Sequence, residues 1–309
     1  MDKEQLDKLE KKLRGIKVEA FIINQGEKQV FEYIKNNKVK EKPFKVYSIT
    51  KTIISLMVGV LVDRAMISSI HTPILEYFPE IKNDEDPEKK EITIHHLLTM
   101  TSGLNVFGLE GSKNWVDTIL RQPLLHEPGT TFQYSSGDSH LLSAIVQKVS
   151  GMPVAFFAEE VLFKPLGINE YSWLTDPQGI HNGGYGIRLK PAHLMTLGNL
   201  LLNSGRHHAN QIISENWIYH MTTPFKETKT EDQGTYGYGY QIWTYKSSHH
   251  YQPLDFYCAS GIYGQNIFIV PKLELVAVVK SQLQLEDHGL PRIYFKEFLR
   301  GLENKMQTI

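Results

Sequence analysis

Segments with the residue pattern of β-strands occur at both ends of this chain, and a long segment with a mainly helical pattern separates them. Apolar, aromatic and β-branched residues are concentrated in six short runs. These runs are residues 18–24, 29–34, 238–245, 255–259, 266–270 and 275–281. From Ser48 to about Leu202, apolar residues recur mainly at helical spacing instead. Strands from the two ends can share one antiparallel sheet, with the helical segment inserted between them.

This pattern predicts an α+β fold made of an α/β sheet domain and an all-helical domain. Residues 1–47 and 205–309 belong to the predicted sheet domain, and residues 48–204 to the helical domain. A cleft for a ligand is expected where the two domains meet. Amphipathic helices over residues 6–16 and 291–302 are expected to flank the sheet.

Charge and cysteine content exclude several classes of protein. Lys and Arg number 33 and Asp and Glu number 34, so the net charge of −1 offers no basic face for nucleic acid. Cys258 is the only cysteine, so neither an intrachain disulfide nor a cysteine-based zinc site can form. Three segments rich in charged or polar residues are read as connectors or solvated loops, namely 35–45, 82–91 and 226–232.

The chain has no segment typical of a secretory leader or an integral membrane helix. Its N-terminus alternates in charge, whereas a leader needs a continuous apolar stretch. The most apolar run, residues 53–62, contains Ser55 and Gly59 and ends at Asp63. Ten helical residues rise only ~15 Å, about half the thickness of a bilayer core. We therefore expect a buried helix and a cytoplasmic protein, or an extracytoplasmic one if a leader has been removed.

Ser48 and Lys51 form a Ser-x-x-Lys element directly before this apolar helix. Residues three apart on a helix face the same way, so the lysine amine can reach the serine hydroxyl. Partial burial would lower the lysine pKa and let a neutral amine accept the serine proton. A serine helix cap beside a surface lysine is the alternative interpretation of the same spacing.

Three further elements follow in order, and together with Ser-x-x-Lys they carry a resemblance. They are residues 92–104 (ITIHHLLTMTSGL), 128–137 (PGTTFQYSSG) and 259–265 (ASGIYGQ). Here the chain resembles the serine β-lactamase and penicillin-binding-protein superfamily, over residues 18–279. It is most similar to the class C β-lactamase-like branch, with its DD-peptidases, carboxylesterases and 6-aminohexanoate-dimer hydrolase. The resemblance implies a β-lactamase/transpeptidase-like fold and no metal or organic cofactor.

The resemblance assigns roles to the matching residues. Ser48 matches the acylated nucleophile, Lys51 its proton acceptor, and Tyr134 the tyrosine that relays a proton to the leaving group. A lysine ammonium beside Tyr134 would favour its phenolate form. The backbone N–H groups of Ser48 and Ile262 match the oxyanion hole.

Substrate-binding positions of the family match Ser136 and the element Ala259-Ser260-Gly261, but two of these positions depart from its pattern. Ser136 replaces an asparagine, and we expect it to cap a helix beginning near Asp138 rather than to contact substrate. Ala259 replaces a cation that helps to hold the carboxylate of β-lactams and of peptides ending in D-alanine.

The surviving nucleophile, base and oxyanion positions predict a serine hydrolase of small-molecule esters or amides. A penicillin-binding DD-peptidase or a β-lactamase is the alternative, and it requires a β-lactam-like substrate and a surrogate cation such as Arg188. A second alternative is a penicillin sensor or binding protein that does not turn over.

Several other features are ambiguous in the sequence alone. Adjacent histidine pairs are interpreted as solvated or satisfied side chains rather than metal ligands. An aromatic cluster either lines a substrate wall or packs the sheet, and it comprises Tyr236, Tyr238, Tyr240, Trp243 and Tyr263. Residues 183–186 are expected to form a loop leading to the cleft, and Cys258 an inert core thiol.

Overall fold

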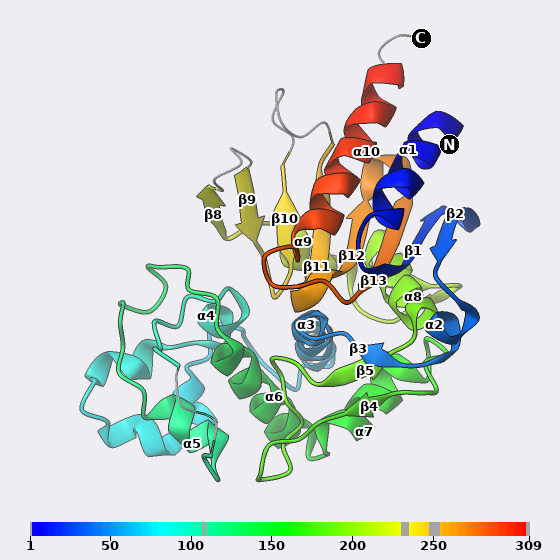
Figure 1. Ribbon diagram of the computed structural model, residues 1–309. Coiled ribbons are helices and arrows are strands. Elements are labelled where there is room, and N and C mark those ends of the chain that lie inside the picture. Colours follow the sequence, from blue (N-terminus) through cyan, green and yellow to red (C-terminus); the bar gives the residue numbers. More distant parts are fainter. Residues whose placement is uncertain (1, 107–108, 110, 230–234, 247–253, 307–309) are drawn as a thin grey trace.

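The computed structural model describes residues 2–106, 109, 111–229, 235–246 and 254–306. Within these residues, one antiparallel sheet has the strand order β2-β1-β13-β12-β11-β10-β9-β8 (Figure 1). Its strands are β1 (Val18–Gln25), β2 (Lys28–Ile34), β8 (Lys226–Lys229), β9 (Thr235–Tyr238), β10 (Trp243–Tyr245), β11 (Phe256–Gly261), β12 (Gln265–Val270) and β13 (Leu275–Ser281). Strand β1 pairs with β13, with Ile22 opposite Val278. The two ends of the chain therefore share one sheet, as predicted.

Helices cover both faces of this sheet, which explains why its central strands are apolar throughout. Helices α1 (Lys3–Arg14) and α10 (Leu290–Met306) lie together across one face (Figure 1). Phe295 of α10 stacks on Phe268 of β12 there, with ring centroids 4.4 Å apart. Helix α8 (Pro191–Leu202) packs on the opposite face, where a Cβ on Gly198 would lie 2.5 Å from Val276 Cγ1. Glycine is needed at this position because the helix and the sheet approach so closely.

The inserted segment is organised around α3 (Ile49–Asp63), a helix that is buried over almost its whole length. Helix α6 (Ser136–Ser150) packs against it, and smaller elements surround the pair. The remaining helices are α2 (Asn37–Glu41), α4 (Ile94–Leu98), α5 (Trp115–Leu120), α7 (Val154–Ala158) and α9 (Glu215–Thr222). The remaining strands are β3 (Phe44–Lys45), β4 (Ser172–Trp173), β5 (Ile187–Leu189), β6 (Arg206–His207) and β7 (Asn210–Gln211). One apolar core runs from these helices to the sheet residues Ile267 and Val276.

Local predictions were wrong at three places. Residues 238–245 form two strands rather than one, because the chain turns between β9 and β10 and Gln241 takes a φ of 61°. The expected connector 35–45 contains α2 and β3, and β3 pairs with β5 inside the segment expected to be helical. Residues 226–229 form β8, while residues 230–232 lie outside the described residues. Most residues of the expected solvated loop 82–91 are exposed as predicted, and only Lys89 is buried, with its ammonium 2.8 Å from Asp84.

Among the described helices, none is by itself both long and apolar enough to cross a membrane. The helices Ser136–Ser150 and Val154–Phe163 meet that test only as a pair, by length and composition, and they are bent by 76° relative to each other.

Candidate active site

A cavity of about 440 Å³ brings most of the predicted site residues together, and we call it the cleft. The cleft is lined by Tyr47, Ser48, Tyr134, Ser136, Tyr185, Trp243, Ser260, Gly261, Ile262, Asn266, His288 and Arg292. Its walls come from the start of α3, the start of α6, the end of β11 and the segment leading into α10. Two predicted residues, Lys51 and Ala259, do not line the cleft and are buried.

Ser48 and Lys51 adopt the geometry that a nucleophile and its base require. Ser48 occupies the N-cap position of α3, but its side chain makes no capping hydrogen bond. The Lys51 ammonium nitrogen lies 3.1 Å from Ser48 Oγ, and only 1% of Lys51 is exposed. The alternative of a capping serine beside a surface lysine is therefore wrong.

Two further acceptors hold the Lys51 side chain beneath the cleft. Lys51 Nζ donates to Ser136 Oγ at 3.0 Å and to the carbonyl of Gly184 at 2.7 Å. Burial lowers the pKa of Lys51 from 10.5 to about 7, and the negative charge of Asp138 acts in the opposite direction. A substantial fraction of Lys51 is therefore a neutral amine near pH 7, and a neutral amine can accept a proton.

Asp138 is a buried carboxyl beneath the same lysine, and sequence reasoning missed its role. Burial raises its pKa to about 7, while hydrogen bonds from Ser102 and Ser135 and the charge of Lys51 act to lower it. Ser102 Oγ donates to Asp138 Oδ1 at 2.8 Å. Among the described residues, Oδ2 has no hydrogen-bond partner. The sequence signal was an acidic residue in the first turn of the helix that begins at the site residue Ser136.

Tyr134 is held at the cleft by aromatic contacts. Its ring stacks on Trp243 with centroids 5.6 Å apart, and Lys51 Nζ lies 5.0 Å from its centroid. Desolvation raises the pKa of Tyr134 to about 12, although a hydrogen bond with Ser48 acts to lower it. The residue keeps 40% of its surface exposed, but the hydroxyl is the group that titrates, and its loss of water dominates. Loss of water therefore acts against the phenolate form that a neighbouring ammonium would favour.

The predicted helix cap belongs to Ser135 rather than Ser136. Ser135 Oγ accepts a hydrogen bond from the Asp138 N–H at 3.2 Å, and Ser136 is the first residue of α6. The prediction shifted the cap by one residue because both serines precede the helical pattern. Ser136 is left free to bind Lys51 and to line the cleft.

The pleat of β11 separates the residues of the third element. Ala259 is 1% exposed and packs in the core, so it does not contact the cleft. Ser260 lines the cleft, and its hydroxyl donates to Asn266 Oδ1 at 3.0 Å. Strand β10 pairs with β11 only as far as Cys258, so the following residues border the cleft instead. Ile262 follows in a short 3₁₀ turn and is 40% exposed.

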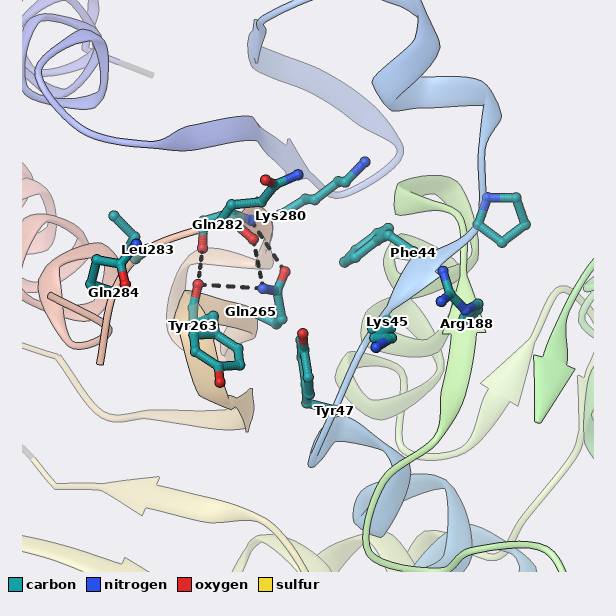
Figure 2. A pocket seen from close by; sticks show the side chains of 12 residues that line it. Phe44, Lys45, Tyr47, Arg188, Tyr263, Gln265, Lys280, Gln282, Leu283 and Gln284 are labelled. Carbon is teal, nitrogen blue, oxygen red and sulfur yellow. Dashed lines mark hydrogen bonds between the residues drawn. The ribbon is translucent and has the colours of Figure 1, made fainter. Parts of the chain in front are cut away.

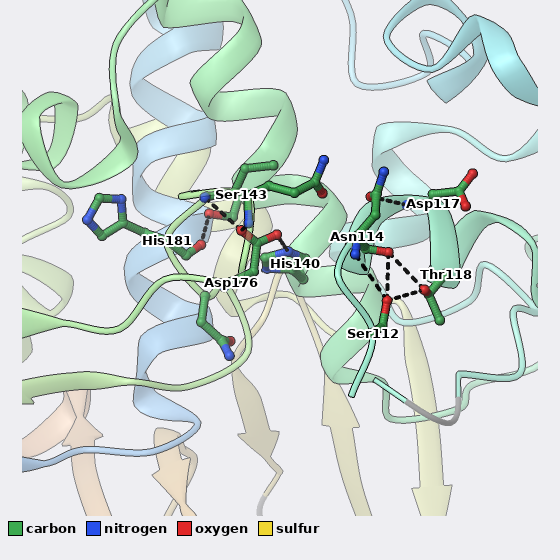
Figure 3. Close-up of polar contacts among 12 residues, drawn as sticks. Ser112, Asn114, Asp117, Thr118, His140, Ser143, Asp176 and His181 are labelled. Carbon is green, nitrogen blue, oxygen red and sulfur yellow. Dashed lines mark hydrogen bonds and ion pairs between the residues drawn. The ribbon is translucent and has the colours of Figure 1, made fainter. Parts of the chain in front are cut away.

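Residues 183–186 reach the cleft as predicted, and a buried polar network holds the segment that precedes them. His140 Nε2 lies 3.1 Å from Asp176 Oδ2, and the Ser143 hydroxyl donates to the carbonyl of His181 at 2.6 Å (Figure 3). Asn182 Oδ1 accepts from the N–H of Gly184 at 2.9 Å. These contacts fix the position of the Gly184 carbonyl that binds Lys51. Because this acceptor is a backbone carbonyl, the residue type at position 184 gives no sign of it in the sequence.

Comparison with known proteins gives a family for this geometry. A family model described as Beta-lactamase matches residues 6–295. The chain belongs to the beta-lactamase family. Its fold is therefore the one that the resemblance implied.

Two of the relatives that the chain matches carry the names of hydrolases. Esterase EstB of Burkholderia gladioli is 31% identical over 153 residues, which is 43% of this chain and 38% of that protein. The 6-aminohexanoate-dimer hydrolase of Paenarthrobacter ureafaciens is 22% identical, with 97% of this chain and 82% of that protein covered. These relatives support a hydrolase of the beta-lactamase family.

Solved structures agree on the fold. EstCE1, a hydrolase with promiscuous acyltransferase activity, matches with a TM-score of 0.80 at 18% identity, covering 97% of this chain and 98% of that one. The octameric penicillin-binding protein homologue from Pyrococcus abyssi matches with a TM-score of 0.77 at 20% identity, covering 97% and 78%. At this level of identity the likeness establishes the fold alone.

The arginine that lines the cleft of this beta-lactamase family member is not the one that the sequence suggested. Arg188, the candidate for a surrogate cation, lines a neighbouring pocket and not the cleft. His288 and Arg292 line the cleft instead, and Arg292 Nη1 donates to the Tyr245 hydroxyl at 3.1 Å. Sequence reasoning missed both residues because they precede and begin a helix far from the other site residues in the chain.

Of the features that were ambiguous in the sequence, some belong to the cleft and others to the core. Trp243 lines the cleft, whereas Tyr238 and Tyr240 are buried. Burial raises the pKa of the Cys258 thiol to about 12, in agreement with an inert core residue. His95 is buried against Phe225, while the predicted pair at 249–250 lies outside the described residues. Within the part of the chain that the structure describes, no group of three or more His, Cys, Asp or Glu residues is arranged to hold a metal.

Proposed function

We propose that the protein is a serine hydrolase that cleaves ester or amide bonds of small molecules through an acyl-enzyme at Ser48. The observation that carries this proposal is the contact of Ser48 Oγ with a buried lysine whose pKa is about 7. A serine hydroxyl is a weak nucleophile unless an adjacent base removes its proton. We assign the role of this base to Lys51.

In the first step, Ser48 Oγ attacks the substrate carbonyl carbon while its proton passes to Lys51 Nζ. The carbonyl oxygen becomes an oxyanion that the N–H groups of Ser48 and Ile262 stabilise. Among the described residues, neither N–H donates a hydrogen bond to another protein group. Both donors are therefore available to a ligand in the cleft.

In the second step, the bond to the leaving group breaks, and the leaving group takes a proton from Tyr134. A phenol whose pKa is raised to about 12 stays protonated at neutral pH, which suits a proton donor. The proton held by Lys51 then restores the Tyr134 hydroxyl, on a ring whose centroid lies 5.0 Å from Lys51 Nζ. Water attacks the acyl-enzyme by the same route and releases the acid and free Ser48.

A second candidate function is hydrolysis or binding of β-lactams or of peptides ending in D-alanine. Arg292 in the cleft favours it, because a guanidinium can bind the carboxylate that such ligands carry. The position that Ala259 occupies supplies no cation. Arg292 would have to replace that cation from a different element.

Intact-protein mass spectrometry during incubation with p-nitrophenyl butyrate and, separately, with a penicillin tests these proposals. The wild type is compared with Ser48→Ala and with Ser69→Ala, which removes an exposed serine outside the cleft. We expect ester turnover and an acyl adduct in the wild type and in Ser69→Ala, and neither in Ser48→Ala. Ser48→Ala with more than a few per cent of the wild-type rate would contradict the assignment.

The penicillin arm separates the alternatives. Rapid turnover of penicillin that depends on Ser48 would favour the β-lactamase function over the esterase or amidase function. A stable penicillin adduct without turnover, and without ester turnover, would indicate a sensor or binding protein. Ester turnover with little penicillin reaction is the outcome that we expect.

A further inference from the structure

A second pocket, of about 420 Å³, lies beside the cleft and is separated from it by Tyr47. Figure 2 shows Arg188 and Lys45 on one side of this pocket and Tyr263 with Gln265 on the other, with Tyr47 between them. Tyr47 lines both cavities and directly precedes the nucleophile Ser48. A ligand in the second pocket therefore lies against the residue that directly precedes Ser48.

The lining of the second pocket is cationic. It contains Lys45, Arg188 and Lys280 but no aspartate or glutamate. The Lys280 ammonium pairs with Glu19 at 3.3 Å, so part of its charge is balanced. Among the described residues, Lys45 and Arg188 have no carboxylate within ion-pair distance. The pocket therefore carries uncompensated positive charge.

The positions of Lys45 and Arg188 in the sheet are unusual for two residues of like charge. Strand β3 pairs with β5 so that Lys45 lies directly opposite Arg188. Like charges at directly opposed cross-strand positions destabilise a sheet. A destabilising pair of this kind is expected at a functional site, where a bound anion would supply the opposite charge.

The opposite wall is fixed before any ligand arrives. Gln265 donates to the carbonyls of Tyr263 and Ser281, at 3.3 and 2.8 Å, and accepts from the Ser281 N–H at 3.2 Å (Figure 2). The Ser281 hydroxyl also donates to the Tyr263 carbonyl. A wall whose polar groups already bind one another does not have to reorganise when a ligand binds.

Two strained tyrosines connect the second pocket to the cleft. Tyr47 and Tyr263 have φ values of 50° and 64°, a left-handed conformation that bulky residues rarely adopt. Their rings meet edge to face, with centroids 5.1 Å apart. Each is adjacent in sequence to an oxyanion-hole residue, Ser48 or Ile262. Burial and Tyr263 raise the pKa of the Tyr47 hydroxyl, while the Arg188 charge acts to lower it, so this charge reaches the boundary between the cavities.

From this geometry we infer that the second pocket binds a carboxylate of the substrate, so that the hydrolase prefers anionic esters or amides. The guanidinium fork of Arg188 suits a carboxylate, and the ammonium of Lys45 opposite it adds a second charge-assisted donor. This inference rests on the proposed acyl-enzyme function of Ser48. It assigns the substrate class through residues that the reaction itself does not use.

The test compares carboxylated esters with neutral twins. Mono-p-nitrophenyl glutarate, with a carboxylate on the acyl group, is compared with p-nitrophenyl valerate. 4-Butyryloxybenzoate, with a carboxylate on the leaving group, is compared with its methyl ester. We expect at least one carboxylated ester to exceed its twin by about tenfold or more in kcat/KM, with a preference that weakens as salt is added.

Variants test whether the preference for carboxylated esters comes from Lys45 and Arg188. Arg188→Gln combined with Lys45→Gln should abolish the preference while neutral esters still turn over, and Arg188→Lys should restore part of it. Lys82→Gln removes an exposed cation outside both cavities and should leave the preference intact. Arg188→Gln alone should not lower the melting temperature, because it relieves a like-charge contact.

The outcomes distinguish this inference from the proposed function. If neither carboxylated ester is preferred, or if the preference survives in the double variant, the carboxylate site is refuted. If glutarate inhibits neutral-ester turnover but no carboxylated ester is preferred, the pocket binds a separate anion and the inference about substrate is also refuted. If even the neutral esters show no turnover that depends on Ser48, the proposed function itself has failed.

Discussion

The lowered pKa of Lys51 predicts how the rate of ester hydrolysis changes with pH. Burial moves this pKa from 10.5 to about 7. At pH 7 about half of the amine is then neutral, compared with about 0.03% for a lysine of ordinary pKa. Because only the neutral amine can accept the Ser48 proton, kcat/KM should fall about tenfold per pH unit well below pH 7. At about pH 5 it should be near one hundredth of its plateau value.

The assay is the initial rate of p-nitrophenyl butyrate hydrolysis between about pH 5 and 9, with circular dichroism at each pH to confirm that the chain stays folded. His288 also lines the cleft. Because the limb is assigned to Lys51, His288→Gln should leave it in place. A rate that still rises about tenfold per pH unit up to about pH 9, or one that stays constant down to about pH 5, would refute the neutral-lysine argument.

A second variant checks the sign of this argument. The Asp138 carboxylate favours the charged form of Lys51 and so raises its pKa. Because the pKa of Asp138 is also about 7, the two groups titrate together, and the Asp138 charge acts on Lys51 mainly in the upper part of the acid limb. Asp138→Asn removes that charge and should move the onset of the limb to slightly lower pH. A limb that moves to higher pH would show that the two groups do not interact in this way.

Three further predictions concern single side chains. Tyr134→Phe keeps the ring on Trp243 but removes the proton donor, so kcat should fall by about 10²–10⁴-fold in stopped-flow assays while the fold is retained. Gly183→Ala would drive a Cβ into the Ser139 carbonyl oxygen, so its melting temperature should drop, whereas Gly289→Ala has room and should change little. Phe295→Ala empties a fully buried aromatic site and should cost about 3–5 kcal/mol in urea unfolding, and a loss below about 1 kcal/mol would contradict the packing described.

The sequence alone was sufficient for features that depend on local spacing. Strand-like runs at both ends predicted a shared sheet, because β-branched and aromatic residues are enriched in strands. Residues three apart on a helix face the same way, and this spacing predicted that Lys51 would lie beside Ser48. The order of the matching motifs also predicted that Ser48, Tyr134 and Ile262 would meet, and all three line one cleft.

Tertiary structure decided which groups surround Lys51 and therefore how it titrates. Its acceptors on Ser136 and Gly184 are 85 and 133 residues away in sequence, and Asp138 lies on the same distant helix as Ser136. Burial sets the pKa of both Lys51 and Tyr134, and burial depends on every element that packs over a side chain.

The tertiary structure also decided which residue of a motif faces the ligand. Ala259 points into the core and Ser260 lines the cleft, because successive side chains of a strand face opposite sides of the sheet. Arg188 lines the second pocket because β5 pairs with β3, and Arg292 lines the cleft because α10 begins there. Spacing along the chain gives the direction of a side chain relative to its own helix or strand. What it then meets is set by how distant helices and strands pack together, which no local pattern encodes.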